Sequence, residues 1–349
     1  MMQIRKSTRQ IHIGNVAVGG GAPVSVQSMT KTDTRDIKST VAQIKELTKA
    51  GCEIIRLGVP DAEAAAALKD IKRQSPIPVV ADIHFDYRLA ITAVESGVDA
   101  LRINPGNIGA PERVKAVVEA ARSRQIPIRI GVNAGSLPRD LDPALPLAER
   151  MIEAAMREVR ALESFEFDLI KVSLKAFDVP ATVAAYRKIS RLIDYPLHLG
   201  ITEAGVPRTG VIRSAVGLGV LLTDGIGDTI RVSLSAHPRE EVFAGYEILK
   251  SLNLRQRGPV LVSCPGCSRS EVDITVLAES VSQALTGIDK TIKVAVMGCA
   301  VNGPGEAADA DVGIACGRGQ GILFRKGEKV GSVAESDFLK VLLKEIQSL

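Results

Sequence analysis

The sequence predicts a (β/α)8 TIM-type barrel followed by a small α+β domain. Short runs rich in β-branched residues alternate with helix-periodic segments over the first three quarters of the chain. A polar, charged stretch at about 253–258 ends this alternation, and the pattern after it is different. The 349 residues, 46% of them hydrophobic, allow about two domains with sizeable cores. We therefore expect a barrel in residues 1–253 and a second domain in residues 258–349.

Eight strand-like runs make up the predicted barrel. They lie at about 24–29, 52–57, 77–82, 99–104, 126–132, 168–174, 196–202 and 228–234. In the first intervening segment Val41, Ile44 and Leu47 share one helix face, Asp36 is a candidate N-cap and Gly51 a candidate C-terminal cap. Eight strands alternating with helices match the (β/α)8 count. The alternation alone also permits a doubly wound open sheet.

Internal repetition indicates that several of these strands are equivalent. Three segments share an acidic residue three positions before an arginine, and a fourth repeats the pattern with lysine: Glu53-Ile-Ile-Arg56, Asp99-Ala-Leu-Arg102, Asp228-Thr-Ile-Arg231 and Asp168-Leu-Ile-Lys171. We interpret them as equivalent points of entry into successive strands.

Polar side chains lie near the ends of the predicted strands, where barrel enzymes place their chemistry. The candidates are Gln27, Ser28, Arg56, Asp82, His84, Arg102, Asn104, Arg129, Asn133, Lys175, Glu203 and Ser233. Where two candidates are spaced by two residues, both side chains point to the same side of the strand. Four of the candidates are cations around one mouth: Arg56, Arg102, Arg129 and Lys175. Such a set needs an anion to neutralise it, and guanidinium groups match phosphate oxygens, so the pattern predicts a diphosphate ligand.

Each candidate also has a simpler interpretation. A strand-end arginine can pair with a neighbouring acid such as Glu53 or Asp99. His84 is either a structural histidine or a metal ligand, and Glu203 is either a functional carboxylate at the rim or an ion-pair partner of Lys175. The remaining histidines and the first cysteine are interpreted as structural: His12, His198, His237 and Cys52.

The last quarter of the chain reads as a compact α+β domain. Strands are expected at 260–262, 292–296, 312–315 and 321–324, with helices at about 271–286 and 335–347. A further helix at about 238–252 closes the barrel before the linker. Lys326-Gly-Glu is a turn signal.

Three cysteines in this quarter occupy two short motifs. The turn Cys264-Pro-Gly-Cys267 aims two thiolates at one point, and Cys299 follows an apolar run. Neighbouring thiolates repel one another unless a metal or cluster neutralises them, which indicates zinc or iron–sulfur. The fourth ligand is either Cys316 or Glu306, since the spacing of a four-cysteine zinc ribbon is absent. The spacing leaves zinc, an iron–sulfur cluster and unrelated core cysteines open.

Composition excludes some functions and favours one compartment. A net charge of +4 without a basic run, 3% aromatic residues and no Trp argue against nucleic-acid binding. The N-terminus lacks the apolar core of a signal peptide, and no apolar stretch is long enough to span a bilayer. Five cysteines without a disulfide framework indicate a reducing compartment. We expect a cytoplasmic protein.

The cysteine motifs are specific enough to indicate a family. With Cys264-Pro-Gly-Cys-Ser-Arg269 and Met297-Gly-Cys-Ala-Val-Asn-Gly-Pro-Gly-Glu306, the chain resembles the 4-hydroxy-3-methylbut-2-enyl diphosphate synthases, iron–sulfur enzymes of the non-mevalonate isoprenoid pathway. Segments 25–29, 170–175 and 198–205 also match, so the resemblance covers essentially the whole chain. It implies one 4Fe–4S cluster per subunit in the second domain, with these ligands: Cys264, Cys267, Cys299 and Glu306.

The resemblance also implies a reaction. In this family 2-C-methyl-D-erythritol 2,4-cyclodiphosphate is opened and reductively dehydroxylated with two electrons and two protons, and water is released. The resemblance implies ferredoxin or flavodoxin as the electron donor. The sequence itself has no flavin or nicotinamide fingerprint. The diphosphate is expected to contact Arg56, Arg102, Arg129, Lys175, Asn133 and Ser233, with Asp82, His84 and Asn104 lining the pocket. Glu203 is the candidate general acid, because a carboxyl group in a closed site can have a raised pKa.

Bacterial members of the family that lack a middle domain place the cluster domain of one subunit over the barrel of another. We therefore expect a head-to-tail homodimer with two composite sites. Two rival interpretations are an iron–sulfur electron carrier or sensor without enzymatic activity, and a barrel enzyme with a structural zinc site.

Overall fold

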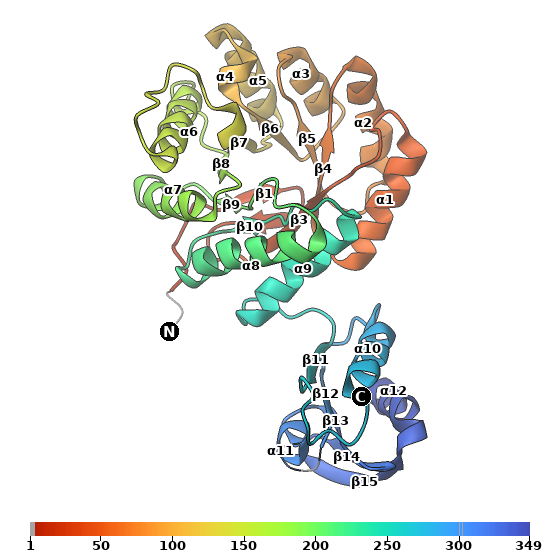
Figure 1. Ribbon diagram of the computed structural model, residues 1–349. Helices are drawn as coiled ribbons and strands as arrows, with labels where there is room; N and C mark the ends of the chain where they lie inside the picture. Colours follow the sequence, from red (N-terminus) through yellow and green to blue (C-terminus); the bar gives the residue numbers. More distant parts are fainter. Residues whose placement is uncertain (1–3, 300, 302) are drawn as a thin grey trace. The chain divides into compact units, whose positions relative to one another are not determined.

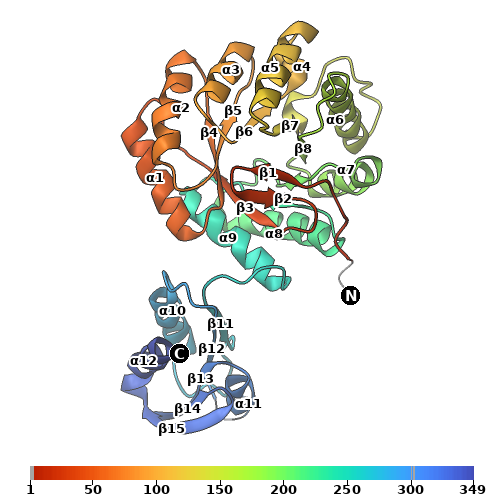
Figure 2. The same cartoon turned by 180° about the vertical axis from the view of Figure 1, so that it is seen from behind.

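The chain divides into two compact units. The structure, a computed structural model, describes residues 4–299, 301 and 303–349. One unit is Met1–Arg255 and the other is Gln256–Leu349. In the first unit helices surround a ring of strands, and the second unit is a smaller sheet with helices on its faces (Figures 1 and 2).

The first unit contains the predicted eight-stranded parallel barrel. Its strands, in chain order, are β3 (Ser25–Met29), β4 (Ile54–Gly58), β5 (Val79–Asp82), β6 (Ala100–Ile103), β7 (Ile128–Asn133), β8 (Ile170–Lys175), β9 (His198–Leu199) and β10 (Thr229–Ile230). Their order in the sheet is β8-β7-β6-β5-β4-β3-β10-β9. A parallel bridge between Val172 and Leu197 joins the two outer strands. The barrel is confirmed, and the open doubly wound alternative is wrong.

Helices follow the strands and cover the barrel from outside. Their bounds are α1 (Ile37–Ala50), α2 (Ala62–Gln74), α3 (Tyr87–Glu95), α4 (Pro105–Ile108), α5 (Pro111–Ser123), α6 (Leu147–Glu163), α7 (Val179–Leu192), α8 (Pro207–Thr223) and α9 (Pro238–Ser251), with a 3-10 turn η1 (Ala134–Ser136). The expected caps of α1 are confirmed: the Asp36 side chain accepts a hydrogen bond from the N–H of Ser39, and Gly51 has a φ of 106°. No helix of the described chain is long and apolar enough to cross a membrane.

The repeated acidic residues lie where strands enter the barrel. Asp168 is exposed and lies 3.6 Å from Arg9. The other three carboxylates each accept a hydrogen bond from a backbone N–H of a neighbouring segment: Val26 to Glu53 at 2.8 Å, Val79 to Asp99 at 2.7 Å and Leu197 to Asp228 at 2.8 Å. Their cationic partners are Arg255, Lys72 and Arg5. The suggestion that strand-end arginines pair with Glu53 or Asp99 is therefore wrong. In each repeat the acidic residue lies at the entry of the strand and the arginine lies further along it, so the two side chains contact different residues.

A hairpin that the sequence did not predict closes the strand-entry end. It consists of β1 (Ile11–Ile13) and β2 (Val16–Val18). Its apolar side chains pack on the first inward-facing residues of three barrel strands, namely Ile54, Val80 and Ala100. Two strands of three residues give too short a hydrophobic pattern to be recognised in the sequence.

The second unit is a five-stranded sheet with helices on both faces. Its elements are β11 (Val260–Ser263), α10 (Ile274–Leu285), β12 (Lys293–Met297), α11 (Gly303–Ala308), β13 (Val312–Gly317), β14 (Gln320–Arg325), β15 (Glu328–Ala334), η2 (Glu335–Asp337) and α12 (Phe338–Ser348). The strand order is β11-β12-β13-β14-β15, parallel across the first three strands and antiparallel after them. Along β12, Val294 and Val296 pack with α10 and α12, whereas Ala295 and Met297 pack with α11.

The predicted elements of this unit are present, but β15 and α11 were missed. β15 is an exposed edge strand with charged residues and a glycine, so it lacks the alternating apolar pattern of a half-buried strand. The turn signal before it is confirmed, because Lys326 and Gly327 have φ values of 48° and 87°.

Candidate active site

The interior of the barrel is lined with charged side chains instead of the branched apolar residues that usually fill such a barrel. Along β7, Ile128 and Ile130 belong to the apolar core under the helices, so the alternate residues Arg129 and Asn133 face the interior. The same alternation on other strands brings six cationic side chains inward: Arg56, Arg102, Arg129, Lys171, Lys175 and Arg231. The barrel thus holds a cationic interior above the apolar layer that the hairpin closes.

Asp82 connects two of the arginines. Its Oδ2 lies 3.4 Å from Nε of Arg56, and its Oδ1 lies 3.1 Å from Nη1 of Arg102. Burial opposes ionisation of Asp82, but Arg56, Arg102 and Arg129 together hold its pKa below the usual value. Burial lowers the pKa of Arg56 to about 10, against the opposing effect of Asp82. The carboxylate therefore stays charged and orients two guanidinium groups.

A second carboxylate, Glu241, holds Arg231. Its Oε2 lies 3.3 Å from Nη2 of Arg231, and it also accepts hydrogen bonds from the Ser28 hydroxyl and the Leu234 N–H. Sequence reasoning did not propose Arg231 or Glu241 as site residues. The acid-x-x-Arg repeat is the signal that could have identified Arg231. Glu241 lies in the first turn of α9 beside Glu240, and nothing in the sequence distinguishes the two.

Arg129 reaches the interior with two of its donor nitrogen atoms unpartnered. Its Nε and Nη1 atoms are buried and have no hydrogen-bond partner in the described structure, and neither do Nε2 and Oε1 of Gln27. Burial, reinforced by Arg56 and Arg102, lowers the pKa of Arg129 well below its ordinary value. A guanidinium nevertheless keeps its proton in proteins. Buried donors without partners beside other cations make this interior suited to a multiply charged anion.

Lys175 lies against His198. Its Nζ is 3.1 Å from Nε2 of His198, whose Nδ1 is 2.7 Å from the hydroxyl oxygen of Thr229. Burial and the nearby Arg129 lower the pKa of Lys175 well below the ordinary lysine value. Burial and Lys175 do the same to the pKa of His198. His198, interpreted from the sequence as structural, is therefore part of the cationic interior.

Glu203 lies on the loop between β9 and α8 in an uncommon backbone conformation. It has a φ of 57°, in the left-handed region that costs free energy for a residue other than glycine. The side chain is exposed, and no ion pair with Lys175 is found in the described structure. The loop is held by hydrogen bonds from Arg213 to the carbonyl of Ala204 and from the N–H of Ser235 to the carbonyl of Gly205.

The remaining predicted residues follow the same strand ends. His84 is exposed beside Phe85, with ring centroids 6.2 Å apart. Asn104 is buried at the end of β6, while Asn133 and Ser233 are half-buried. The loop after Asn104 is held by Glu158 of α6, which accepts a hydrogen bond from the N–H of Gly106 at 2.9 Å. Burial raises the pKa of Glu158 to about 7.

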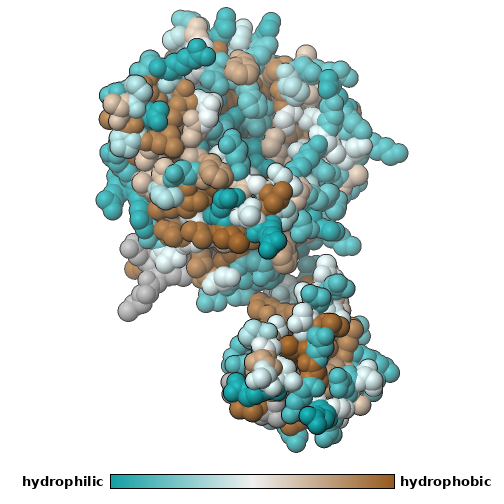
Figure 3. Space-filling model, viewed as in Figure 1, coloured by the Kyte–Doolittle hydropathy of each residue, from teal (hydrophilic) through white to brown (hydrophobic). Residues whose placement is uncertain are grey.

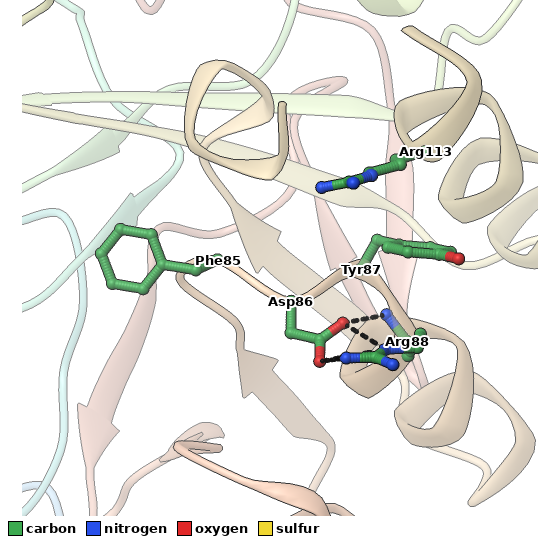
Figure 4. A pocket seen from close by; sticks show the side chains of 5 residues that line it. All are labelled: Phe85, Asp86, Tyr87, Arg88 and Arg113. Atoms are coloured by element: carbon green, nitrogen blue, oxygen red, sulfur yellow. Dashed lines mark hydrogen bonds and ion pairs between the residues drawn. The ribbon is translucent and has the colours of Figure 1, made fainter. Parts of the chain in front are cut away.

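A cavity of about 450 Å³ opens beside the β5–α3 loop (Figure 4). It is lined by Phe85, Asp86, Tyr87, Arg88 and Arg113. Asp86 accepts hydrogen bonds from Arg88, and the Arg113 guanidinium lies over the Tyr87 ring at 5.9 Å, while Phe85 projects from the other side of the loop. The cations of the barrel interior do not line this cavity, which therefore adjoins the site without being its floor.

In the second unit, two cysteines follow neighbouring parallel strands. Cys264 comes directly after β11, and Cys299 comes two residues after β12. Because Ser263 pairs with Val296, both strands end at the same edge of the sheet. The N–H of Gly298 donates a hydrogen bond to Sγ of Cys264 at 3.2 Å. The two cysteine motifs are therefore brought together.

The other proposed ligands flank this edge. Cys267 is exposed, and its N–H donates to the hydroxyl of Ser270. Glu306 is exposed in the short helix α11, which begins at Gly303. Among the described residues no three His, Cys, Asp or Glu side chains lie close enough together to hold a metal ion. The described contacts thus connect the Cys264 motif with the Cys299 motif, and the roles of Cys267 and Glu306 stay predictions.

Cys316 lies on β13 in the same sheet, within electrostatic range of Cys264. It is fully buried in β13 and packs in the apolar core with α10 and α12. Burial raises the pKa of its thiol to about 12. Both features are those of a small apolar core residue.

Comparisons with known proteins find matches along almost the whole chain. A family model described as the GcpE TIM-barrel domain matches residues 8–246, and one described as the GcpE protein C-terminal domain matches residues 260–348. The 4-hydroxy-3-methylbut-2-en-1-yl diphosphate synthase (flavodoxin) of Dehalococcoides mccartyi is 66% identical over 348 residues and covers 100% of both chains. The protein of the same name from Geobacter sulfurreducens is 60% identical and covers 99% of both chains.

Solved structures with a similar fold are dihydropteroate synthases. The Yersinia pestis enzyme has a TM-score of 0.52 and 11% identity, over 71% of this chain and 100% of that chain. The Xanthomonas albilineans enzyme with 4-aminobenzoic acid has a TM-score of 0.51 and 12% identity, over 71% of this chain and 99% of that chain. At such low identity these likenesses concern the fold alone.

Proposed function

The chain belongs to the GcpE family, and on this premise we propose that it converts 2-C-methyl-D-erythritol 2,4-cyclodiphosphate to 4-hydroxy-3-methylbut-2-en-1-yl diphosphate. The relatives compared above carry the name of this product. The observation that carries the proposal in this chain is the cationic interior of the barrel. An electron carrier or sensor does not require a group of buried cationic side chains in its barrel, so we set that alternative aside.

The barrel binds the diphosphate in this proposal. Arg56 and Arg102, held by Asp82, present two oriented guanidinium groups, and Arg231 is held in the same way by Glu241. The unpartnered donors of Arg129 and the amine of Lys175 complete the anion site. Asn104, Asn133, Ser233 and His84 lie at the same strand ends and line the mouth. Charge-assisted, partly bidentate bonds to phosphate oxygens are the interactions for which guanidinium groups are best suited.

The second unit holds a 4Fe–4S cluster in this proposal. Cys264, Cys267 and Cys299 are its thiolate ligands, and the N–H···S bond from Gly298 to Cys264 is of the kind that tunes such clusters. Burial of Cys316 in the core supports Glu306 as the fourth ligand. When bound, the cluster supplies single electrons and a Lewis-acidic iron.

The chain's own residues bind the substrate and move protons. The cations fix the diphosphate and neutralise its charge, so the carbon skeleton is oriented toward the mouth. The carboxyl group of Glu203 gives a proton to the departing hydroxyl oxygen, which leaves as water. Its strained backbone supports this role, because such conformations cluster where a side chain must be placed accurately. Two electrons are consumed as the ring C–O bond to the diphosphate and the C–O bond of the hydroxyl break and a C=C bond forms between the two carbons. A second proton, from solvent, ends on the freed phosphate oxygen, so atoms and electrons balance.

Flavodoxin is the proposed electron donor, since the relatives carry it in their names, and ferredoxin remains the alternative donor. The choice is tested by comparing turnover with each reduced protein at equal concentration.

We further propose a head-to-tail homodimer. Arg255 is bound to Glu53 and to the carbonyl of Val24, so the chain leaves the barrel at the strand-entry end. Glu203 lies near the opposite ends of the strands, where Lys175 also lies. Bacterial members of the family that lack a middle domain combine the cluster unit of one subunit with the barrel of another, and the proposal extends that arrangement to this chain.

The outer face of α8 offers a surface for such a partner. Ile212, Val216 and Val220 are 63%, 54% and 36% exposed and recur every four residues, so they form one stripe. Figure 3 shows apolar side chains gathered over this helix. An exposed apolar patch of this kind marks a protein contact, and the proposed occupant is a second copy of the chain.

A turnover assay tests the proposed function. The chain, purified without oxygen and supplied with reduced flavodoxin and the cyclic diphosphate, should give a linear diphosphate that phosphorus NMR distinguishes from the ring. Glu203→Gln should bind the substrate with unchanged affinity and lose turnover. Glu166→Gln is the matched control, because Glu166 is also exposed and has a φ of 56°. Full turnover by Glu203→Gln, or none by the native chain, would contradict the proposal.

A further inference from the structure

The contact between Lys175 and His198 limits the positive charge that the two side chains can carry together. Their nitrogen atoms are 3.1 Å apart, and both side chains are buried, His198 at 0% and Lys175 at 6% exposure. An ammonium and an imidazolium at this distance repel each other strongly, so the pair carries at most one positive charge. The second ring nitrogen of His198 lies at the Thr229 hydroxyl, which fixes the orientation of the ring.

The groups around this pair are mostly cationic. Lys175 is faced by Arg56 from β4, Arg102 from β6, Arg129 from β7 and Arg231 after β10. Lys171, four residues earlier on β8, acts on His198. Tyr186 of α7 donates a hydrogen bond to the carbonyl of His198 and stays neutral, since burial raises its pKa. The two carboxylates that contact these cations are Asp82 and Glu241, and each is already paired with arginine.

This charge imbalance has a consequence for the lysine. Arginines keep their protons, so the lysine amine is the group whose proton can leave when no anion is present. Desolvation and the surrounding guanidinium groups both act in this direction, and they lower the pKa of Lys175. A diphosphate placed among the arginines offsets the excess positive charge, and the amine then gains an anionic partner for its proton.

We propose that Lys175 takes up one proton when the diphosphate binds, and that His198 is the positioning residue which holds the amine and accepts its hydrogen bond. The proton comes from solvent and forms an N–H bond at Nζ of Lys175, and no other bond changes. His198 stays neutral throughout, with Nε2 as the acceptor and the Nδ1–H directed to Thr229. The inference rests on the proposed function, because it needs a diphosphate ligand.

The space beside Gly200 is occupied by the Lys175 amine, and a larger residue at position 200 would clash with it. A Cβ placed on Gly200, which directly follows β9, would lie 2.7 Å from Nζ of Lys175. The glycine therefore lets Lys175 lie across β9 to reach His198. Because the His198 imidazole and the Gly200 backbone hold the Lys175 amine in place, the amine can gain a proton without changing its position.

Calorimetry counts the proton directly. The chain, purified without oxygen and kept without a reductant so that no turnover occurs, is titrated with the cyclic diphosphate in several buffers of different ionisation enthalpy at neutral pH. The slope of the observed enthalpy against the buffer enthalpy should correspond to uptake of about one proton. The affinity of the native chain should fall by about tenfold for each pH unit above neutrality, since each binding event must then recruit a scarcer proton.

Variants assign the proton to the pair. Lys175→Arg, which cannot release its proton, should bind with a slope near zero and a flat pH profile. Lys171→Met should keep the uptake, because that lysine is not the proposed acceptor. His198→Leu should weaken binding by about tenfold, the effect of one charged hydrogen bond. His198→Gln, whose amide oxygen can replace the ring acceptor, should restore most of the affinity, and the exposed His237→Gln is the matched control.

The outcomes separate the inference from the function on which it rests. Binding by the native chain with a slope of zero, or uptake that persists in Lys175→Arg or vanishes in Lys171→Met, overturns the inference and leaves the function standing. No binding of the cyclic diphosphate by the folded native chain overturns both. If Lys175→Arg fails to bind, the native pH profile decides, and a flat profile overturns the inference.

Discussion

Asp82 shows how one residue prepares the barrel for an anion. It contacts Arg56 and Arg102 through different oxygen atoms, so two guanidinium groups that would otherwise repel each other share a carboxylate. All three side chains are at least largely buried, which makes the arrangement rigid at a cost in desolvation. The diphosphate offsets part of that cost when it binds.

Removal of either arginine should weaken substrate binding without affecting the second unit. Arg56→Ala and Arg102→Ala each delete charged hydrogen bonds to the diphosphate, so we expect a loss of about 1.5–3 kcal/mol per bond in binding free energy. Iron content should not change. Isothermal titration with the cyclic diphosphate measures the effect.

Arg73→Ala is the matched control, since Arg73 is exposed on α2 and pairs only locally with Asp70 at 2.9 Å. Native affinity in both interior variants would mean that these arginines serve only to pair with Asp82.

Glu158 should make the stability of the barrel depend on pH. Burial raises its pKa from 4.5 to about 7, so the folded chain retains a proton there that the unfolded chain releases. Stability should therefore fall as the pH rises from about 4.5 to about 7. Glu158→Gln has no such titration and should gain about 1–3 kcal/mol relative to the native chain across this window. Urea unfolding at several pH values measures the difference, and a difference that is constant with pH would count against the assignment.

The sequence could predict residues whose position follows from a strand, and it failed for those supplied by helices. Arg56, Arg102 and Lys175 were identified because the end of a parallel strand places a side chain at the mouth. Glu241 and Glu158 act from α9 and α6, where a buried acid looks the same in the sequence as an exposed one. Arg231 was visible in the repeat, but its strand end was represented by Ser233 alone.

At the scale of elements, Gly131 of β7 leaves space for the Arg102 side chain from the neighbouring strand β6. A Cβ on Gly131 would lie 2.4 Å from Nε of Arg102, and the Gly131 carbonyl accepts a hydrogen bond from Nη2 of the same arginine at 3.1 Å. The glycine thus allows Arg102 to cross β7 at close range.

Gly131→Ala should displace the Arg102 guanidinium and weaken binding of the cyclic diphosphate about as much as loss of the arginine's hydrogen bonds, by about 1.5–3 kcal/mol. Gly135→Ala is the matched control, because a Cβ there meets nothing within 4 Å and the backbone needs no positive φ. Equal affinities of the two variants would show that Arg102 adapts without cost.

The lengths of the last two barrel strands, β9 and β10, could not be predicted from the sequence pattern. Runs at 196–202 and 228–234 have the composition of full strands, but the paired residues are His198–Leu199 and Thr229–Ile230. Beyond them the backbone leaves the ladder to form the Glu203 loop and the segment around Arg231. A strained turn at Glu203 depends on tertiary contacts, such as that of Arg213 with Ala204, which no local pattern encodes.

At the scale of the molecule, subunit complementation between two inactive variants tests the proposed dimer. Glu203→Ala removes the general acid from the barrel, and Cys299→Ser removes a ligand from the cluster unit. If each site combines the barrel of one copy with the cluster unit of another, a mixture of the two inactive variants should recover turnover, about a quarter of the native level after random subunit exchange. Exchange is followed with differently tagged chains. No recovery in spite of exchange would mean that both units of one chain serve the same site.

The central claim is that the edge of the second sheet holds an iron–sulfur cluster through the three cysteines after β11 and β12. The iron and acid-labile sulfide content of the chain purified without oxygen tests it most directly, with Cys299→Ser and Cys316→Ser measured alongside. We expect about four iron and four sulfide atoms per native chain. We expect the same content in Cys316→Ser and a loss of the cluster in Cys299→Ser. A colourless native chain that contains zinc, or a cluster lost in Cys316→Ser and kept in Cys299→Ser, would contradict the claim.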